Sequence, residues 1–211
     1  MRVNEDVMDE TTRKAMKLLL DLKSLAFATV AGKEPDVRII NAMLVEEDGV
    51  YFTTARGKPF YEQLRQLPEI AICGVTDDSV SVRLLGHVKQ CSGRKMMEKI
   101  LEHNPGLGQL YPGEKSDILE AFHLYRAKGE IFDLSGERPI RDRFAFGGDT
   151  VNPPGYRITS KCTACGACSG CCPVEVIQEG EPYRIDGRSC LECGRCVEIC
   201  PEDAIEPGPG L

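Results

Sequence analysis

Apolar side chains recur at helical spacing near the start of the chain, at Ala15, Leu18, Leu19, Leu22 and Leu25. Positions three and four apart lie on one face of an α-helix, so the pattern predicts an amphipathic helix over residues 9–23. The next apolar run, LAFATVA, no longer has this period. The helix is therefore expected to end before it.

Three short stretches rich in β-branched and aromatic residues come next, at 25–31, 36–45 and 50–55. The dipeptide Asp48-Gly49 stands directly before the third stretch. Such a dipeptide between alternating apolar and polar flanks is typical of a β-hairpin. We therefore expect three antiparallel strands here.

Helical spacing and strand alternation predict the remaining elements of the first part of the chain in the same way. They are a helix at 58–67 that stops at Pro68, strands at 69–75, 79–90 and 129–134, and helices at 94–103 and 115–127. Strands of this number and length, with helices around them, fit a small closed barrel. The fold class expected for residues 1–135 is α+β.

The pattern changes after residue 135. Glycines and prolines interrupt the segment 136–155, GERPIRDRFAFGGDTVNPPG, and predict a linker or docking loop without regular structure. Its charged and aromatic part, RDRFAFGG, is interpreted as linker, and docking of the following segment is the alternative. Residues 156–211 hold nine of the 11 cysteines, and we expect them to form a separate small domain.

Composition narrows the function classes. Of the 211 residues 28% are charged, and the net charge of -7 argues against a nucleic-acid binder. No apolar run approaches the ~18 residues of a membrane span, so no membrane association is expected. The first ten residues, MRVNEDVMDE, lack the basic and apolar regions of a secretory signal. We expect a cytoplasmic protein.

The cysteines of the last domain form an internal repeat. Cys162, Cys165, Cys168 and Cys172 are each followed 28 residues later by Cys190, Cys193, Cys196 and Cys200. Both copies read C-x2-C-x2-C-x3-C-P, and Gly166/Gly194 and Ile177/Ile205 keep the same offset. A repeat of this quality indicates two copies of one binding unit related by approximate two-fold symmetry.

Three thiolates with two residues between neighbours can bind three corners of an iron–sulfur cube, while the fourth ligand comes from elsewhere. Zinc more often takes two C-x2-C pairs, and a disulfide framework needs an oxidising compartment. Residues 156–207 resemble the two-cluster bacterial ferredoxins, in which the fourth cysteine binds the other cluster. The resemblance implies two 4Fe-4S clusters, one on Cys162, Cys165, Cys168 and Cys200, the other on Cys190, Cys193, Cys196 and Cys172.

Residues 8–135 resemble the flavin-binding split barrel of the pyridoxamine 5'-phosphate oxidase superfamily. The segments that carry this resemblance are LAFATVAGKEPDVRII, DGVYFTTARGKPFYEQLRQLPEIAIC and VRLLGHV. Proteins of this kind bind FMN at a homodimer interface, so the resemblance implies FMN and a dimer. In that context RDRFAFGG could also cap the flavin.

The resemblance assigns seven positions to the flavin: Arg38, Ile40, Asn41, Thr53, Thr54, Arg56 and Lys58. The resemblance implies that Arg38 and Lys58 are the phosphate ligands, with Arg56 close by, and cations together with a helix N-terminus suit such an anion site. Ile40 and Asn41, which follow Arg38 in the chain, would lie beside the isoalloxazine. Thr53 and Thr54 would lie near it at the end of the third strand. Purely structural roles as strand and turn residues are the alternative.

The remaining cysteines and the histidines are interpreted structurally. Cys73 and Cys91 are expected to be small buried hydrophobic side chains, and Cys171 an unliganded neighbour of a cluster, with ligand exchange as the alternative. His87, His103 and His123 are read as barrel or surface side chains. Haem ligation by His87 is the alternative, since some split barrels bind haem.

Two departures bear on the reaction. The chain has no Trp, and the iron–sulfur tail stands where the oxidase carries an Arg- and Trp-containing segment. True pyridoxamine 5'-phosphate oxidation is therefore not expected, and dioxygen-sensitive clusters favour an anaerobe. No G-x-G-x-x-G fingerprint of a nicotinamide domain appears.

These features predict an iron–sulfur flavoprotein oxidoreductase. A ferredoxin-like donor would reduce the clusters, and the clusters would then reduce FMN. The reduced flavin would in turn reduce a small acceptor such as a nitro compound, a quinone or a free flavin. Relatives linked to nitroimidazole resistance suggest the nitro compound. A non-enzymatic electron carrier or redox sensor is one alternative, and a cofactor-binding module without turnover is another.

Overall fold

The computed structural model describes residues 8–41 and 43–211, which form two compact units. The first unit consists of three segments: the described residues as far as Thr76, then Val82–Gly129, and then Phe144–Thr150. The second contains Asp77–Ser81, Glu130–Arg143 and Val151–Leu211. Most of the acidic start used above, and Ala42 in the expected strand 36–45, lie outside the described residues.

The first element is helix α1, Glu10–Leu22, as the apolar spacing predicts. Asp9 caps its N-terminus, where the side chain accepts a hydrogen bond of 2.6 Å from the backbone N–H of Thr12. The apolar face is buried through Ala15, Met16 and Leu19. Helix α1 contacts strands β3 (Leu44–Glu46) and β5 (Glu69–Val75) of the sheet and so covers part of it.

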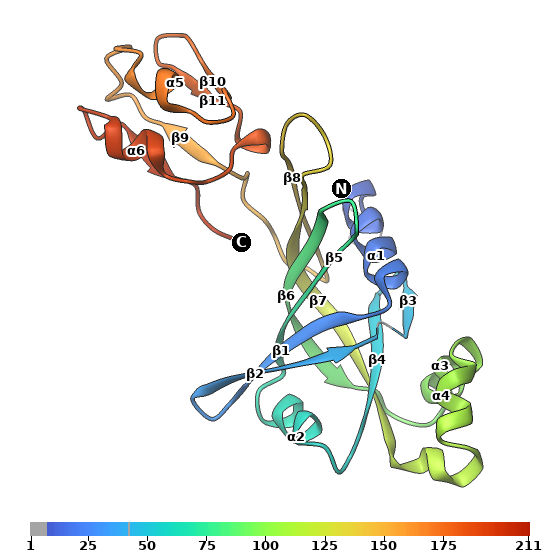
Figure 1. Cartoon of the computed structure of the whole chain (residues 1–211). Coiled ribbons are helices and arrows are strands. Elements are labelled where there is room, and N and C mark those ends of the chain that lie inside the picture. The colour runs from blue at the N-terminus through green and yellow to red at the C-terminus, as the bar shows by residue number, and fades with distance from the viewer. Residues whose placement is uncertain (1–7, 42) are drawn as a thin grey trace, which may run out of the picture. The chain divides into compact units, whose positions relative to one another are not determined.

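One large sheet dominates the fold (Figure 1). Its strands are β1 Leu25–Ala31, β2 Glu34–Ile40, β3 Leu44–Glu46, β4 Gly49–Ala55, β5 Glu69–Val75, β6 Val80–Gln90, β7 Leu119–Asp133 and β8 Ile140–Phe146. The order is β2-β1-β5-β6-β7-β4-β3, with β8 paired to β7. The two end strands, β2 and β3, are consecutive in the chain, so at most about 14 Å separates their joined ends. The sheet therefore curves back on itself as the expected barrel does.

The hairpin of β3 and β4 forms where the dipeptide Asp48-Gly49 predicts it. Glu46 pairs with Gly49, and the turn between them consists of Glu47 and Asp48. Gly49 has φ +140°, and a Cβ atom at this position would lie 2.1 Å from the carbonyl oxygen of Leu124. Glycine is therefore required for β4 to pair with β7 here.

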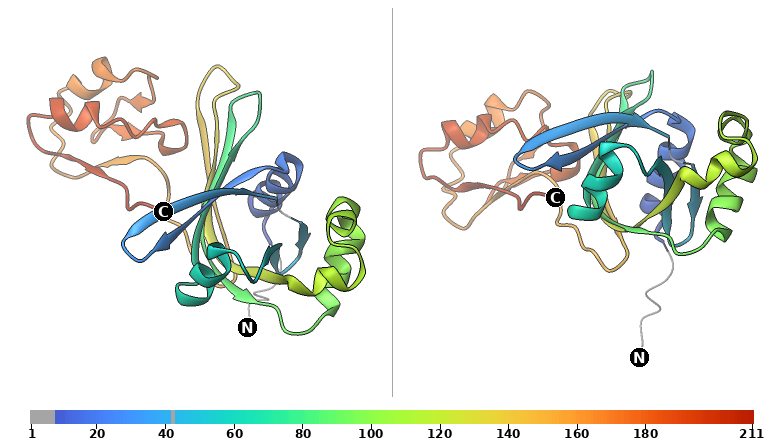
Figure 2. Two further views of the ribbon diagram at one scale, coloured as in Figure 1. Left: turned by 60° about the horizontal axis from the view of Figure 1, so that its bottom comes forward. Right: turned by 90° about the horizontal axis from the view of Figure 1, so that it is seen from below.

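Four short helical segments accompany the barrel: α2 Pro59–Gln66, α3 Lys95–His103, α4 Pro105–Leu110 and the 3₁₀ turn η1 Gly113–Ile118. Helix α2 contacts β1 and β4, while α3 and α4 lie side by side away from α2 (Figure 2). The expected helix 115–127 is wrong, because most of it belongs to β7. Residues 121–124 of β7 are all buried, and pairing with β4 outweighs the local helical pattern.

The barrel core is aromatic. The rings of Phe27 and Phe52 lie 5.0 Å apart, and Phe52 also stacks on Phe60 and Phe122, both at 5.9 Å. The expectation that Cys73 is a buried side chain is wrong, since strand alternation on β5 buries Ile72 and leaves Cys73 exposed. Cys91 is half-buried and packs against the apolar core cluster that includes Met97 and Ile100 of α3.

The expectation that 136–155 lacks regular structure is also wrong, because β8 lies inside it. Charged residues hide the alternation of this strand. Arg141 is buried within the second unit, where it pairs with Glu130 of β7. A buried arginine cannot be recognised from hydrophobic periodicity alone.

The second unit contains the small cysteine-rich module, residues 151–211. Its elements are β9 Tyr156–Ile158, α5 Ala167–Cys171, β10 Ile177–Gln178, β11 Arg184–Ile185, η2 Gly187–Ser189, α6 Arg195–Ile199 and β12 Ile205–Pro207. Strand β9 pairs with β12, β10 pairs with β11, and α5 packs on α6. Within residues 8–41 and 43–211, no helix is long and apolar enough to cross a membrane.

Candidate functional site

The backbone of the cysteine-rich module repeats as its sequence does. Positive φ angles occur in pairs 28 residues apart, at Ala164 and Glu192 (both 56°), Gly166 and Gly194 (80° and 79°), and Glu175 and Asp203 (53° and 46°). Left-handed residues at matching positions turn the chain identically in both halves. The two halves therefore present their cysteines from equivalent loops.

Two pockets lie in the module, and four cysteines line each of them. The first contains Cys162, Cys165, Cys168 and Cys200, and the second Cys172, Cys190, Cys193 and Cys196. Each pocket thus takes three cysteines from one repeat and one from the other. Cys171 lies outside both sets, and its Sγ donates to the carbonyl oxygen of Cys168 at 3.2 Å.

The loops offer backbone donors to the sulfurs. The N–H groups of Ala164, Glu192 and Ala204 lie 3.4 Å from the Sγ atoms of Cys162, Cys190 and Cys200. Thiolates are soft ligands that iron–sulfur clusters favour, and N–H donors to sulfur stabilise their charge. The donor set and its surroundings fit 4Fe-4S clusters.

Burial disfavours bare thiolates in these pockets. Burial first, and then the neighbouring Cys190 thiolate, raises the pKa of Cys196 to about 11, and burial likewise raises the pKa of Cys168. These two thiols are therefore protonated at neutral pH in the metal-free protein, and binding a cluster must release their protons. Within the described residues, no three His, Cys, Asp or Glu side chains converge closely enough to hold a single metal ion.

Arg38, the first expected phosphate ligand, lies on β2 against α2. Its guanidinium donates to Thr29 Oγ1 at 2.6 Å and to Gln63 Oε1 at 2.8 Å, and lies 4.4 Å from the centre of the Phe60 ring. It also forms an ion pair of 2.5 Å with Asp36. A hydrogen bond from Gln63, followed by the Arg38 charge, lowers the pKa of Asp36 although burial opposes this. Arg38 is thus held near the first turn of α2.

Sequence reasoning missed the residues around Arg38. Gln63 links them, since its Nε2 donates to Asp36 at 2.8 Å and its Oε1 accepts from Thr29 at 2.6 Å. Gln63 is 8% exposed, and Phe60 stands three residues before it on the same face of α2. A polar residue at an apolar position of a short amphipathic helix is the signal that could have identified it.

The other expected flavin residues lie at the end of β4 and the start of α2. Thr53 and Thr54 are buried, and no hydrogen-bond partner of Thr54 Oγ1 lies within the described residues. Arg56 forms a 2.7 Å ion pair with Glu120, while exposed Lys58 is the N-cap residue of α2. An unpaired buried hydroxyl, followed two and four residues later in the chain by Arg56 and Lys58, fits a polar, anionic ligand such as FMN.

Ile40 and Asn41 lie beyond Arg38 at the end of β2. Ile40 pairs with Leu25, whereas Asn41 is exposed and follows the last residue of the strand. The structure therefore holds Arg38 against Phe60 and Gln63 of α2. Thr53, Thr54, Arg56 and Lys58 follow one another along the chain from β4 to the N-cap of α2.

The histidines have structural environments. His123 is 5% exposed, its Nε2 lies 2.9 Å from the carbonyl oxygen of Asp48, and its ring stacks on Tyr51 at 4.3 Å. Burial lowers the pKa of His123, so the ring is neutral at pH 7. His87 is half-buried on β6 and His103 is exposed at the end of α3.

Comparisons with known proteins agree with both parts of the structure. Residues 155–201 match the family described as 4Fe-4S dicluster domain. A ferredoxin from Butyribacterium methylotrophicum is 58% identical over 31 residues, which are 15% of this chain and 56% of that protein. The chain thus spans about half the length of this curated relative.

Two solved structures resemble the barrel. One is a NimC/NimA family protein from Clostridium acetobutylicum, with 25% identity, a TM-score of 0.60, and coverage of 67% of this chain and 96% of that one. Another is a putative pyridoxamine 5'-phosphate oxidase from Listeria innocua, with 17% identity, a TM-score of 0.48, and coverage of 59% and 98%. The expected fold class, an α+β split barrel joined to a ferredoxin-like domain, is confirmed.

Proposed function

We propose that this protein is an iron–sulfur flavoprotein oxidoreductase that moves electrons between a protein donor, two 4Fe-4S clusters, FMN and a small acceptor. The observation that carries the proposal is the pair of pockets, each lined by four cysteines drawn from both repeats. Such pockets suit one-electron carriers, and a flavin accepts either one or two electrons. Redox electron transfer is the function that these two parts share.

The chain's own residues have defined tasks in this proposal. The crossed cysteines bind the clusters and join the two repeats, and the N–H groups of Ala164 and Glu192 offset thiolate charge. Tyr183 lines the first pocket and Tyr156 the second, so each pocket has an aromatic wall that excludes water. When bound, the clusters supply reversible one-electron transfer.

For FMN we propose the seven residues named from the resemblance. Lys58 and Arg56 would bind the phosphate at the start of α2, and Thr54 would offer its unpaired hydroxyl to the flavin. Arg38 would reach the phosphate by exchanging Asp36 for it, since both are anions. Ile40, Asn41 and Thr53 would line the isoalloxazine.

A homodimer is part of the proposal because one sheet face is apolar and uncovered. Val37 and Ile39 of β2 are each 65% exposed, and their strand partners on β1 are Ala28 and Ala26. Cys73, paired with Ala26, extends the same face. An uncovered apolar face of this kind is typical of an interface. Ile39→Lys is expected to give monomers in light scattering, whereas Lys33→Glu, on the neighbouring turn, should leave the dimer intact.

For the acceptor we propose a nitro compound, a quinone or a free flavin, reduced in the cytoplasm of an anaerobe. The resemblance of the barrel to split-barrel relatives linked to nitroimidazole resistance favours trying nitro compounds first. Cys165 and Cys193 are exposed at the edge of the two pockets. This exposure favours electron exchange with a ferredoxin-like donor, and it equally supports the second candidate function, a carrier or redox sensor that serves only protein partners.

The test begins with protein purified without oxygen. We expect about eight irons and one FMN per chain, and full reduction by dithionite. Stopped-flow oxidation of the reduced protein by a panel of acceptors then separates the candidates, because an enzyme turns over a small acceptor and a carrier does not. Eight irons without FMN would contradict the flavoprotein proposal, and oxidation no faster than in buffer would contradict the enzyme.

A further inference from the structure

The two cluster loops share one backbone but differ at three side chains, since Leu191, Glu192 and Arg195 replace Thr163, Ala164 and Ala167. Of these, Glu192 carries the contacts described next. Ala164 and Glu192 occupy equivalent positions, both with φ 56° and both with an N–H group 3.4 Å from the preceding cysteine sulfur. Left-handed backbone disfavours residues with a β-carbon, so the side chain there is not chosen for the turn itself. Glu192 therefore has a role that the first loop does not need.

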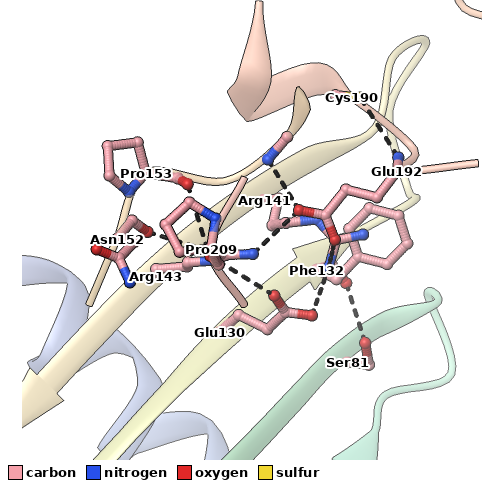
Figure 3. A network of polar contacts seen from close by, with 11 residues as sticks. Ser81, Glu130, Phe132, Arg141, Arg143, Asn152, Pro153, Cys190, Glu192 and Pro209 are labelled. Atoms are coloured by element: carbon pink, nitrogen blue, oxygen red, sulfur yellow. Dashed lines mark hydrogen bonds and ion pairs between the residues drawn. The ribbon is translucent and has the colours of Figure 1, made fainter. Parts of the chain in front are cut away.

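Glu192 is bound on both of its carboxylate oxygens (Figure 3). Its Oε1 accepts from the backbone N–H of Gly155 at 2.8 Å and from Arg143 Nη2 at 3.0 Å. Its Oε2 lies 3.8 Å from Arg141 Nη1. The loop Cys190–Cys193 is thereby attached to two arginines of β8.

The arginines are themselves buried and paired. Arg141 lies 2.5 Å from Glu130 and over the ring of Phe132 at 4.2 Å. Arg143 donates to the carbonyl oxygens of Asn152, Pro153 and Pro209 at 3.0–3.3 Å, and lies 3.7 Å from Glu130. The exposed fractions of these side chains are 3% for Glu130, 8% for Arg141 and 5% for Arg143.

The four side chains form a neutral set of two carboxylates and two guanidiniums. A buried charge without its partner is far less stable than a complete pair, so each member depends on the others. Removing Glu192 would leave an excess positive charge beside the second pocket. Removing Arg143 would leave an excess negative charge there.

We infer that Glu192 is a positioning residue that fixes the second cluster loop to β8. Through this contact it gives the second cluster a midpoint potential different from that of the first. This inference rests on the proposed function, in which the eight cysteines hold two clusters. Reduction adds one negative charge to a cluster. An excess positive charge therefore raises the midpoint potential of the nearby cluster, and an excess negative charge lowers it.

The experiment compares Glu192→Gln and Arg143→Gln with the wild type, all loaded with iron. Glu198→Gln is the matched control, because Glu198 lies two residues from both Cys196 and Cys200 but its side chain is 72% exposed. We expect Glu192→Gln to raise, and Arg143→Gln to lower, one of the two midpoint potentials in an EPR-monitored titration. The other midpoint should stay in place, and the control should move neither.

Selective loss of half the iron in either variant, with the control fully loaded, would also support the inference, since the second loop would no longer be held. Unchanged midpoints at full iron content would overturn it. Shifts of the same sign in both variants, or equal changes at both clusters, would overturn it as well. A wild type without about eight irons would instead refute the proposed function, so the two failures are distinguishable.

Discussion

The barrel and the cysteine-rich module are stabilised in different ways. In the barrel, Phe27, Phe52 and Phe122 are almost fully buried and contact one another or share neighbours. In the module, the buried cluster consists of Cys168, Ile177, Cys196 and Ile205, so half of it is cysteine that also lines the two pockets. The barrel therefore depends on apolar burial, and the module depends on what its cysteines bind.

Loss of iron tests this comparison most severely. Removing the clusters from the whole protein with an oxidant and a chelator, without oxygen, is expected to unfold residues 156–207. So small a region cannot bury enough apolar surface by itself. Hydrogen exchange should show full loss of protection in the module and unchanged protection in β1 and β4. Protected amides in the iron-free module would contradict the comparison.

The converse change removes an aromatic ring from the barrel. Phe52→Ala is expected to lower the free energy of unfolding of the barrel by about 3–5 kcal/mol, because a large buried side chain leaves a cavity. Chemical denaturation followed by circular dichroism measures this, and Leu110→Ala, at a position 70% exposed, is the control. The visible spectrum of the clusters should be the same in both variants before denaturation. A cluster spectrum lost together with the barrel would show that the two parts do not fold independently.

A smaller effect is expected at the β3–β4 hairpin. Gly49→Ala places a Cβ atom 2.1 Å from the Leu124 carbonyl oxygen and should destabilise the barrel by about 1–3 kcal/mol. Gly57→Ala is the matched control, since a Cβ atom there meets nothing within 4 Å. The midpoints of urea unfolding compare the two. Equal midpoints would mean that β4 and β7 can separate without loss of stability.

The smallest effect concerns pH. Burial lowers the pKa of His123 in the folded barrel below its ordinary value of about 6.5, so the unfolded chain binds a proton first as the pH falls. The barrel should lose stability below about pH 6.5, and His123→Gln should reduce that loss. Urea midpoints between pH 8 and 5 measure it. An identical pH dependence in the variant would exclude His123 as its source.

Sequence analysis predicted the parts of the structure that depend on local patterns. The 28-residue cysteine repeat, helix α1 and the β3–β4 hairpin each follow from spacing along a short segment. The domain boundaries and the site residues stay predictions. The expected strand 36–45 is two strands, β2 and β3, which belong to opposite ends of the sheet order.

Long-range pairing explains the remaining errors. Residues 115–127 fit the helical period, and only pairing with strands elsewhere in the sheet, such as the distant β4, makes most of them part of β7. Strand β8 was missed because its buried arginines pair with Glu130 and Glu192. For Glu192 a signal did exist, since it replaces Ala164 at the 28-residue offset.

Each repeat of the module contributes residues to the pocket of the other, so neither repeat forms a complete binding site alone. Each pocket receives a cysteine from the other half, and the hydroxyl groups of Tyr183 and Tyr156 approach Gly166 and Gly194. A single repeat is thus an incomplete binding unit that becomes complete only with a second copy. The module is in effect an internal homodimer whose two subunits are joined covalently. Such an arrangement is what gene duplication of a self-associating peptide would leave behind, with each half free to diverge only where, as at Ala164 and Glu192, the shared backbone is preserved.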